Sequence, residues 1–120
     1  MDTTRELAPE SWSEYFDAVS EDLLNDSVSI EIIDALSPPM MEAQRLALQA
    51  LTYDERNHVF EVAAARGGPR GPSVLRHLID HPSRIAVDSM TSLAPSTIVV
   101  DGRDGVRTVI RTEHEAAFTG

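Results

Sequence analysis

The stretch RHLIDHPSRIAVD, residues 76–88, decides the fold, because it fits either a helix that carries a metal site or two strands joined by a bend. On a helix, His77 and His81 would share one face, one turn apart, as zinc ligands do. Pro82 disfavours a helical conformation at His81, and the β-branched residues around the segment favour extension. In an extended chain the two histidines are about 13 Å apart and Asp80 points to the other face, whereas zinc requires ligands at about 2 Å. We therefore predict a bent strand.

A metal or small-ligand site at His77, Asp80 and His81 is the weaker hypothesis for the same stretch. A shared ligand would require a sharp bend at residues 80–82. The favoured interpretation is a turn in which Asp80 caps the backbone and His77 packs or hydrogen-bonds locally.

Other residue types that carry chemistry form no recognisable site. His58 and His114 are single histidines beside polar residues, which favours a solvated role. No serine lies in a nucleophile elbow, no glycine-rich phosphate loop is present, and acid pairs are the background of so acidic a chain. We predict no catalytic residue, no bound metal and no cofactor.

Segments on both sides of the opening stretch alternate apolar and polar residues with the period of a strand. Strands are expected at residues 28–32, 58–65, 73–79, 83–88, 96–100 and 106–112. Between the last two, DGRDG favours a tight hairpin turn. The residues expected to supply positive-φ positions there are Asp101, Gly102, Asp104 and Gly105.

The segment SWSEYFDAVSEDLLN, residues 11–25, predicts a helix, with apolar residues at helical spacing and acids opposite them. Ser11 and Glu14 match a capping box. The aromatic residues of the segment are expected to anchor the helix to a sheet, and an exposed aromatic patch that binds a partner is the alternative. The candidate interaction residues on this basis are Trp12, Tyr15 and Phe16.

The segment SPPMMEAQRLALQALTYDE, residues 37–55, is ambiguous. Its Ala, Leu, Gln and Met residues favour a helix by propensity. Leu46, Leu48 and Ala50, however, alternate with smaller or polar residues, and a strand context can override propensity. Local sequence leaves both interpretations open.

The chain has 120 residues, which is the size of one domain. We expect a domain at residues 1–112 and a flexible tail at residues 113–120. Cysteine is absent, which excludes disulfides and thiolate zinc sites. No apolar run approaches the roughly 20 residues that span a bilayer, and no signal-peptide pattern is present, so no membrane association and a cytoplasmic location are expected.

Twenty acidic residues against ten arginines, with no lysine, give a formal charge of -10. Nucleic-acid binders need clustered positive charge, so a nucleic-acid partner is disfavoured. The acidic, lysine-free composition favours a GC-rich genome and would suit a high-salt cytoplasm. RGGPRGP, residues 66–72, is expected to be a mobile loop, in which Arg66 and Arg70 are candidate contacts for an acidic partner.

Five stretches follow one another along the chain: SWSEYFD, VSIEII, LALQALTYDERNHVFEVAA, LRHLIDHPSRIAV and IVVDGRDGVRTVIR. Over residues 5–112 their order resembles a family of short bacterial and haloarchaeal proteins classed only as a domain of unknown function. The resemblance favours a strand at residues 43–53 and implies no activity, cofactor or catalytic residue. SPPMMEAQ departs from the family's often Gly-rich, Gln-containing entry to that strand. The family positions implied are Trp12, Phe16, Leu46, Leu48, Tyr53, Asp54, His77, Ile79, Pro82, Ile85 and Gly105.

We predict an α+β fold in which an N-terminal helix packs on a bent antiparallel sheet of about six or seven strands. By fold-level analogy with Sm-like and SH3-like barrels, closure into a small barrel is expected. The leading functional hypothesis is a noncatalytic protein-interaction or regulatory module that binds another protein or itself, as in a homodimer, through sheet edges or the helix face. The alternatives are a metal-dependent or small-ligand-binding protein that uses the His77 turn, and an Sm-like nucleic-acid binder, which the acidity disfavours.

Overall fold

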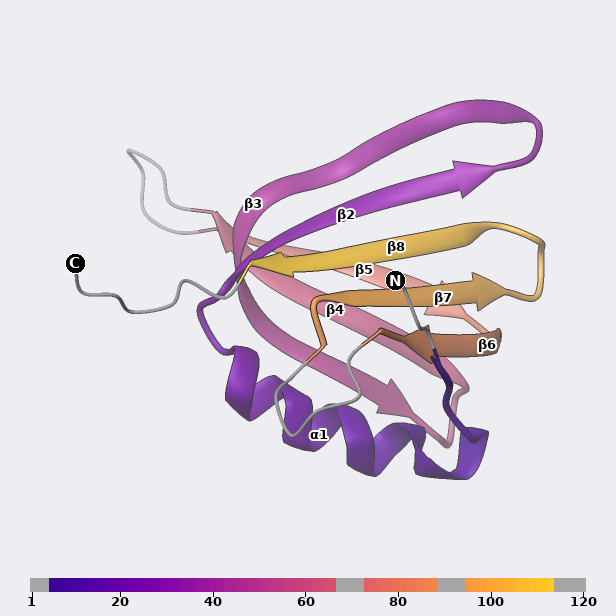
Figure 1. Cartoon of the computed structure of the whole chain (residues 1–120), viewed down its shortest axis with the longest axis horizontal. Coiled ribbons are helices and arrows are strands. Elements are labelled where there is room, and N and C mark those ends of the chain that lie inside the picture. The colour runs from indigo at the N-terminus through magenta and orange to yellow at the C-terminus, as the bar shows by residue number, and fades with distance from the viewer. Residues whose placement is uncertain (1–4, 67–72, 89–94, 114–120) are drawn as a thin grey trace.

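In the computed structural model, the chain folds as one α-helix packed on a single antiparallel sheet of eight strands (Figure 1). The structure describes residues 5–66, 73–88 and 95–113. The elements are β1 (Arg5–Glu6), the 3-10 turn η1 (Pro9–Ser11), α1 (Trp12–Leu23), β2 (Ser27–Asp34), β3 (Ser37–Asp54), β4 (Val59–Arg66), β5 (Ser73–Asp80), β6 (Pro82–Val87), β7 (Thr97–Gly102) and β8 (Arg107–Glu113). Within these ranges no helix is long and apolar enough to cross a membrane. The predicted helix-plus-sheet class is confirmed.

The strand order is β1-β6-β7-β8-β2-β3-β4-β5, so the sheet contains two meanders of consecutive antiparallel strands that lie side by side. One run is β2 to β5 and the other is β6 to β8. The join is the antiparallel pairing of β2 with β8, which spans Ser27↔Glu113 to Ile33↔Arg107. Strand β8 therefore lies in the middle of the sheet although it comes last among the described strands.

A single residue, His81, connects β5 to β6, although these strands belong to opposite halves of the sheet. Its backbone N–H donates to the carbonyl of His58 at 2.7 Å, and its carbonyl accepts from Arg103 N–H at 3.2 Å. His81 adopts a φ of 50°, which turns the chain sharply. The prediction of a bent strand is thus confirmed. The predicted closure into a barrel was wrong, because the described strands form an open sheet with β1 and β5 at its edges.

Helix α1 buries one face, chiefly against β3 (Figure 1). Phe16 meets Phe60 of β4 in an edge-to-face arrangement with ring centroids 4.9 Å apart. Trp12 meets Tyr53 of β3 in the same way at 5.0 Å. Because edge-to-face pairs add to the burial of apolar surface, these contacts fix the helix on the sheet.

Two hydrogen-bonded links position the helix further. The indole Nε1 of Trp12 donates to the carbonyl of Leu7 at 3.2 Å. The hydroxyl of Ser20 donates to the carbonyl of Leu51 in β3 and accepts from the N–H of the same residue, each at 2.7 Å. The second link ties the middle of the helix to the sheet backbone.

Strand β3 runs from Ser37 to Asp54 without interruption, although it contains good helix formers. It pairs with β2 over its first part and with β4 over its second, and these pairings override local propensity. Arg45, with a φ of 55°, marks a bulge at which the register against β2 shifts, and such bulges bend a strand. The prediction of a strand at residues 43–53 is confirmed. The strand begins earlier than this range, at Ser37.

The predicted capping box was wrong. Ser11 is the N-cap of α1, but its hydroxyl donates to the carbonyl of Ala8 at 2.8 Å and makes no capping bond to the helix. The Ser11 hydroxyl is instead directed back to the 3-10 turn that precedes the helix.

The turn between β7 and β8 also differs from its prediction. Of the four residues expected at positive φ, only Gly105 has this conformation, with a φ of 88°. Gly102 closes the turn through its N–H, which donates to the carbonyl of Val106 at 2.9 Å. Glu113, predicted as the first residue of a tail, is the last residue of β8, and residues 114–120 lie outside the described ranges.

Candidate functional site

Strand β5 ends the sheet and has a hydrogen-bonded neighbour, β4, on one side only among the described residues. Its register with β4 is uninterrupted and continues to the bond between His81 N–H and the His58 carbonyl. Because hydrogen-bonded residues alternate along an antiparallel strand, the odd-numbered residues of β5 bond to β4. The residues whose backbone N–H and C=O face the free edge are Val74, Arg76, Leu78 and Asp80.

The side chains of β5 alternate with the same period. His77 is half-buried and Ile79 is buried on the inner face of the sheet. On the outer face, Val74 and Leu78 keep 60% and 59% of their surface exposed. Strands that are apolar on both faces are normally covered on both faces. The exposed pair therefore indicates a surface that lacks a neighbour.

Charged side chains flank Leu78 on the outer face. Arg76 binds Glu61 of β4 through two hydrogen bonds, with Nε at 2.6 Å and an Nη at 3.1 Å from the carboxylate oxygens. Two-thirds of the Arg76 side chain is still exposed, as is 71% of the Asp80 side chain. Along the outer face of β5, a basic, an apolar and an acidic residue thus follow one another, each two positions after the last.

The other strands that have a hydrogen-bonded neighbour on one side only carry features that discourage pairing with a further strand. The short β1 covers β6. The first part of β3, which pairs with β2 only, contains Pro38 and Pro39, and proline protects sheet edges because it lacks an N–H. Strand β5 contains neither a proline nor a bulge.

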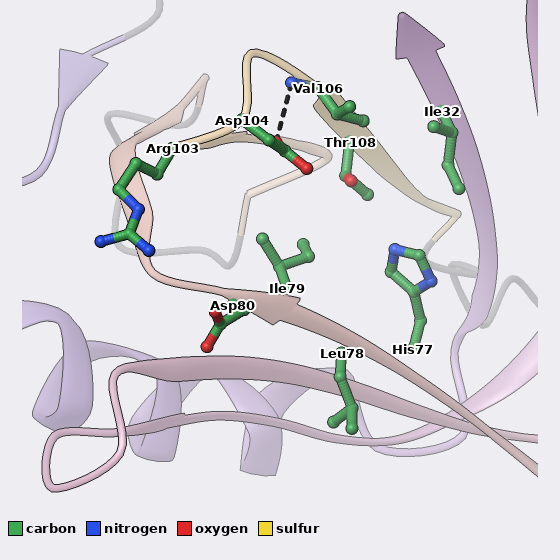
Figure 2. Close-up of a pocket in the computed structure, with 9 residues that line it drawn as sticks. All are labelled: Ile32, His77, Leu78, Ile79, Asp80, Arg103, Asp104, Val106 and Thr108. Carbon is green, nitrogen blue, oxygen red and sulfur yellow. Dashed lines mark hydrogen bonds between the residues drawn. The ribbon is translucent and has the colours of Figure 1, made fainter.

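A groove of about 320 Å³ lies on the inner side of the β5 edge, between β5 and the ends of β2 and β8 (Figure 2). From β5, His77 and Ile79 point toward Ile32 and Thr108 on the facing strands, whereas Leu78 points away. The charged lining residues, Asp80, Arg103 and Asp104, are all exposed and stand at its rim. The remaining lining residues are Leu78 and Val106.

Burial lowers the pKa of His77 below its usual value, and the charge of Glu42 opposes this shift only in part. The imidazole is therefore uncharged at neutral pH, because its ordinary pKa is already about 6.5. A neutral imidazole can donate one hydrogen bond and accept another inside the groove.

The three residues of the metal hypothesis are divided between two places. His77 points into the groove, whereas the Asp80 side chain belongs to the outer face and reaches only the rim of the groove. His81 lies at the bend beside Asp80, where its ring stacks obliquely on that of His58 with centroids 5.3 Å apart. His81 Nδ1 is 2.9 Å from an Asp80 oxygen without hydrogen-bond geometry, and this buried nitrogen has no other partner among the described atoms. In the described ranges no three histidine or acidic side chains are grouped so as to hold a metal ion.

The aromatic residues expected to contact a partner are mainly core residues. Trp12 is 3% exposed and Phe16 is fully buried, so both side chains form part of the core that fixes the helix on the sheet. Tyr15 is partly buried against Phe16, and burial raises the pKa of its hydroxyl. Arg66 is exposed at the end of β4, and Arg70 lies outside the described residues.

Sequence reasoning missed the exposed pair Val74 and Leu78 and the groove residues across from them. The signal for the pair is present in SVLRHLID, because both alternating faces of this strand carry apolar residues. Ile32 and Thr108 join the groove only through the pairing of β2 with β8, which brings together residues far apart in the chain. No local pattern reports such a pairing.

Comparisons with known proteins give a family without an assigned activity. Residues 3–118 match the family described as "Family of unknown function (DUF5335)". An uncharacterized protein of Aquifex aeolicus (strain VF5) is 30% identical over 108 residues, which cover 90% of each chain. No solved structure matches the chain significantly.

Proposed function

The chain belongs to this family of unknown function, and we propose that it is a noncatalytic protein-interaction module that binds an extended protein segment along the edge of β5. The observation that carries the proposal is the free edge of an eight-residue strand with exposed apolar side chains beside a groove. An added strand gains backbone hydrogen bonds from the edge and specificity from its alternate side chains.

The surface of β5 provides both kinds of contact. Four residues direct backbone donors and acceptors outward, in one row. On the outer face, Val74 and Leu78 offer apolar area, and full burial of such a side chain is worth about 1.5–3 kcal/mol. On the inner face, the groove is lined by apolar side chains together with two uncharged polar ones, His77 and Thr108, and its charges stand only at the rim, which suits an uncharged side chain of the added strand.

The test is affinity capture with the wild-type protein and two matched variants. Leu78→Glu places a charge on the β5 edge, and Leu36→Glu makes the same change at a residue that is 93% exposed in the β2–β3 turn. We expect Leu78→Glu to lose its bound protein and Leu36→Glu to retain it. Equal retention by both variants would reject the β5 edge as the binding surface.

Amide hydrogen exchange locates the contact independently. In the free protein the amides of Val74, Arg76, Leu78 and Asp80 should exchange fast, because they face the open edge. Binding along β5 should protect these four amides together. Protection elsewhere, with these amides unchanged, would place the interaction on another surface.

A second candidate is supported by the groove alone. Its volume lies at the lower end of the range of about 300–1,000 Å³ for small-ligand sites, and both His77 and Asp80 line it. The ligand would be a small apolar molecule with one group that hydrogen-bonds to the neutral imidazole. Val106→Trp, which fills the groove, should abolish a ligand-induced rise in melting temperature, and an unchanged rise would exclude this site.

A further inference from the structure

The outer face of β5 is complementary to itself. Arg76, Leu78 and Asp80 follow one another at every second residue, in the order base, apolar, acid. An antiparallel copy of the same strand presents these residues in reverse order. Pairing the two copies about Leu78 sets leucine against leucine and each arginine against an aspartate.

Backbone geometry limits which registers are available to such a pair. An outward-facing residue of one copy must lie opposite an outward-facing residue of the other, so a twofold axis passes through a residue. An axis at Arg76 would set two guanidinium groups opposite each other. An axis at His77 would set Arg76 opposite Leu78 and Val74 opposite Asp80. Only the axis at Leu78 matches charges and apolar groups together.

We propose that the strand accepted by the β5 edge is β5 of a second copy, which forms a twofold dimer with Leu78 on the axis. This proposal rests on the proposed function and names its partner. Each Arg76 faces Asp80 of the other copy, and each Ile79 faces His77 of the other copy on the inner face.

The free chain already holds the required groups in place. Glu61 fixes the Arg76 guanidinium on the outer face and uses only two of its five N–H groups, which leaves donors for a second carboxylate. Asp80 is the last residue of β5, directly before the bend, where the backbone bonds of His81 fix the chain. The uncharged His77 ring can pack against Ile79 without desolvation of a charge.

The net charge of -10 on each chain opposes association. This repulsion acts over a long range and is screened by salt, with a Debye length of about 8 Å at physiological ionic strength. Contacts between directly opposed side chains are shorter than this length. The dimer should therefore be measured at physiological or higher ionic strength.

A charge-exchange experiment tests the proposal. Arg76→Asp sets acids opposite acids at both ends of the pair, and Asp80→Arg sets bases opposite bases. The dissociation constant of each variant should rise about tenfold or more. An equimolar mixture of the two variants should form a heterodimer, because every facing pair then joins an acid to a base.

In that mixture, the acid introduced by Arg76→Asp lies opposite the base introduced by Asp80→Arg, and the native Asp80 and Arg76 of the two chains also face each other. Arg56→Asp, an equal charge reversal in the exposed β3–β4 turn, is the matched control and should dimerise like wild type. Light scattering after size exclusion gives the mass, which is 13.2 kDa for one chain. Recovery of a dimer from two monomeric variants also shows that both are folded.

The proposal would be overturned by a wild-type chain that stays monomeric at millimolar concentration. A dimer that survives both charge reversals, or a mixture of folded variants that stays monomeric, would overturn it as well. These failures are separable from failure of the proposed function. If the wild type is monomeric but Leu78→Glu alone loses a different bound protein, the edge still binds a strand and only its identity as a second copy is wrong.

Discussion

At the scale of single residues, Ser20 makes the most direct polar link between α1 and the sheet, through its two hydrogen bonds to Leu51. Ser20→Ala leaves both backbone groups of Leu51 without this partner in a partly buried position. We expect the free energy of unfolding to fall by about 1–3 kcal/mol. Urea denaturation measures this loss, with Ser13→Ala on the same helix as the control. Equal effects of the two substitutions would show that the Ser20 link contributes little.

Asp88 supplies a residue-scale prediction about pH. Desolvation raises the pKa of its carboxyl, but hydrogen bonds from the Ser96 side chain and from the backbone N–H groups of Ser96 and Thr97 outweigh it and hold the pKa below its usual value. A carboxyl with a lowered folded-state pKa stabilises the fold above its unfolded pKa, about 3.9, and this contribution is lost as the pH falls through the folded pKa.

Asp88→Asn removes this titration. The variant should be less stable than wild type at neutral pH, and the difference should shrink as the pH falls below about 4. Thermal unfolding across this pH range measures it. A difference that is constant with pH would contradict the role given to the Asp88 carboxylate.

The histidines show what sequence can predict at this scale. The separation of His77 from His81 followed from Pro82 and from strand geometry, and the structure confirms it. The stacking of His81 on His58 was not predicted, because it depends on the approach of two turns that are distant in sequence. Local patterns report conformation well and long-range contacts poorly.

At the scale of elements, the alternation along β5 predicts opposite responses to proline at neighbouring positions. The N–H of Leu78 faces the free edge, whereas that of His77 lies on the side bonded to β4. Leu78→Pro should therefore destabilise the monomer little beyond Leu78→Ala, while His77→Pro, which leaves a β4 carbonyl without its donor, should cost about 1–3 kcal/mol more than His77→Ala. Urea denaturation at low protein concentration makes the comparison. If Leu78→Pro destabilised the monomer more than His77→Pro, the even-numbered residues of β5, and not the odd-numbered ones, would be those that bond to β4.

Strand β3 shows why an element can be missed by local reasoning. Its sequence from Ser37 onward favours a helix by propensity, yet it lies between β2 and β4. The decisive energy comes from partners on both sides, which a local window does not contain. The family resemblance favoured a strand at this place. It did not predict the bulge at Arg45.

At the scale of the whole molecule, the charge of -10 predicts how stability responds to salt. Self-repulsion among twenty acids opposes the compact state, and added salt screens it. The melting temperature of the monomeric Arg76→Asp variant should therefore rise with sodium chloride. Using a monomeric variant separates this effect from association. A melting temperature that falls with salt would show that the ion pairs outweigh the repulsion.

The helix, the antiparallel strands and their order along the chain could be predicted from the sequence. The openness of the sheet could not, because closure depends on whether β5 meets another strand after the bend at His81. The candidate site lies in that opening. Its edge was detectable in principle from SVLRHLID, but its groove depends on how the two halves of the sheet face each other.

The central position of β8 also constrains how the chain acquires its structure during synthesis. Pairing of Ser27 with Glu113 joins residues that are far apart in the chain, and such non-local pairings make folding slow. At about 5–20 residues per second, the ribosome delivers β2 several seconds before β8. During that interval β2 has its partner β3 on one side only. The nascent chain therefore exposes a second apolar edge, at which premature association with other chains would compete with correct folding.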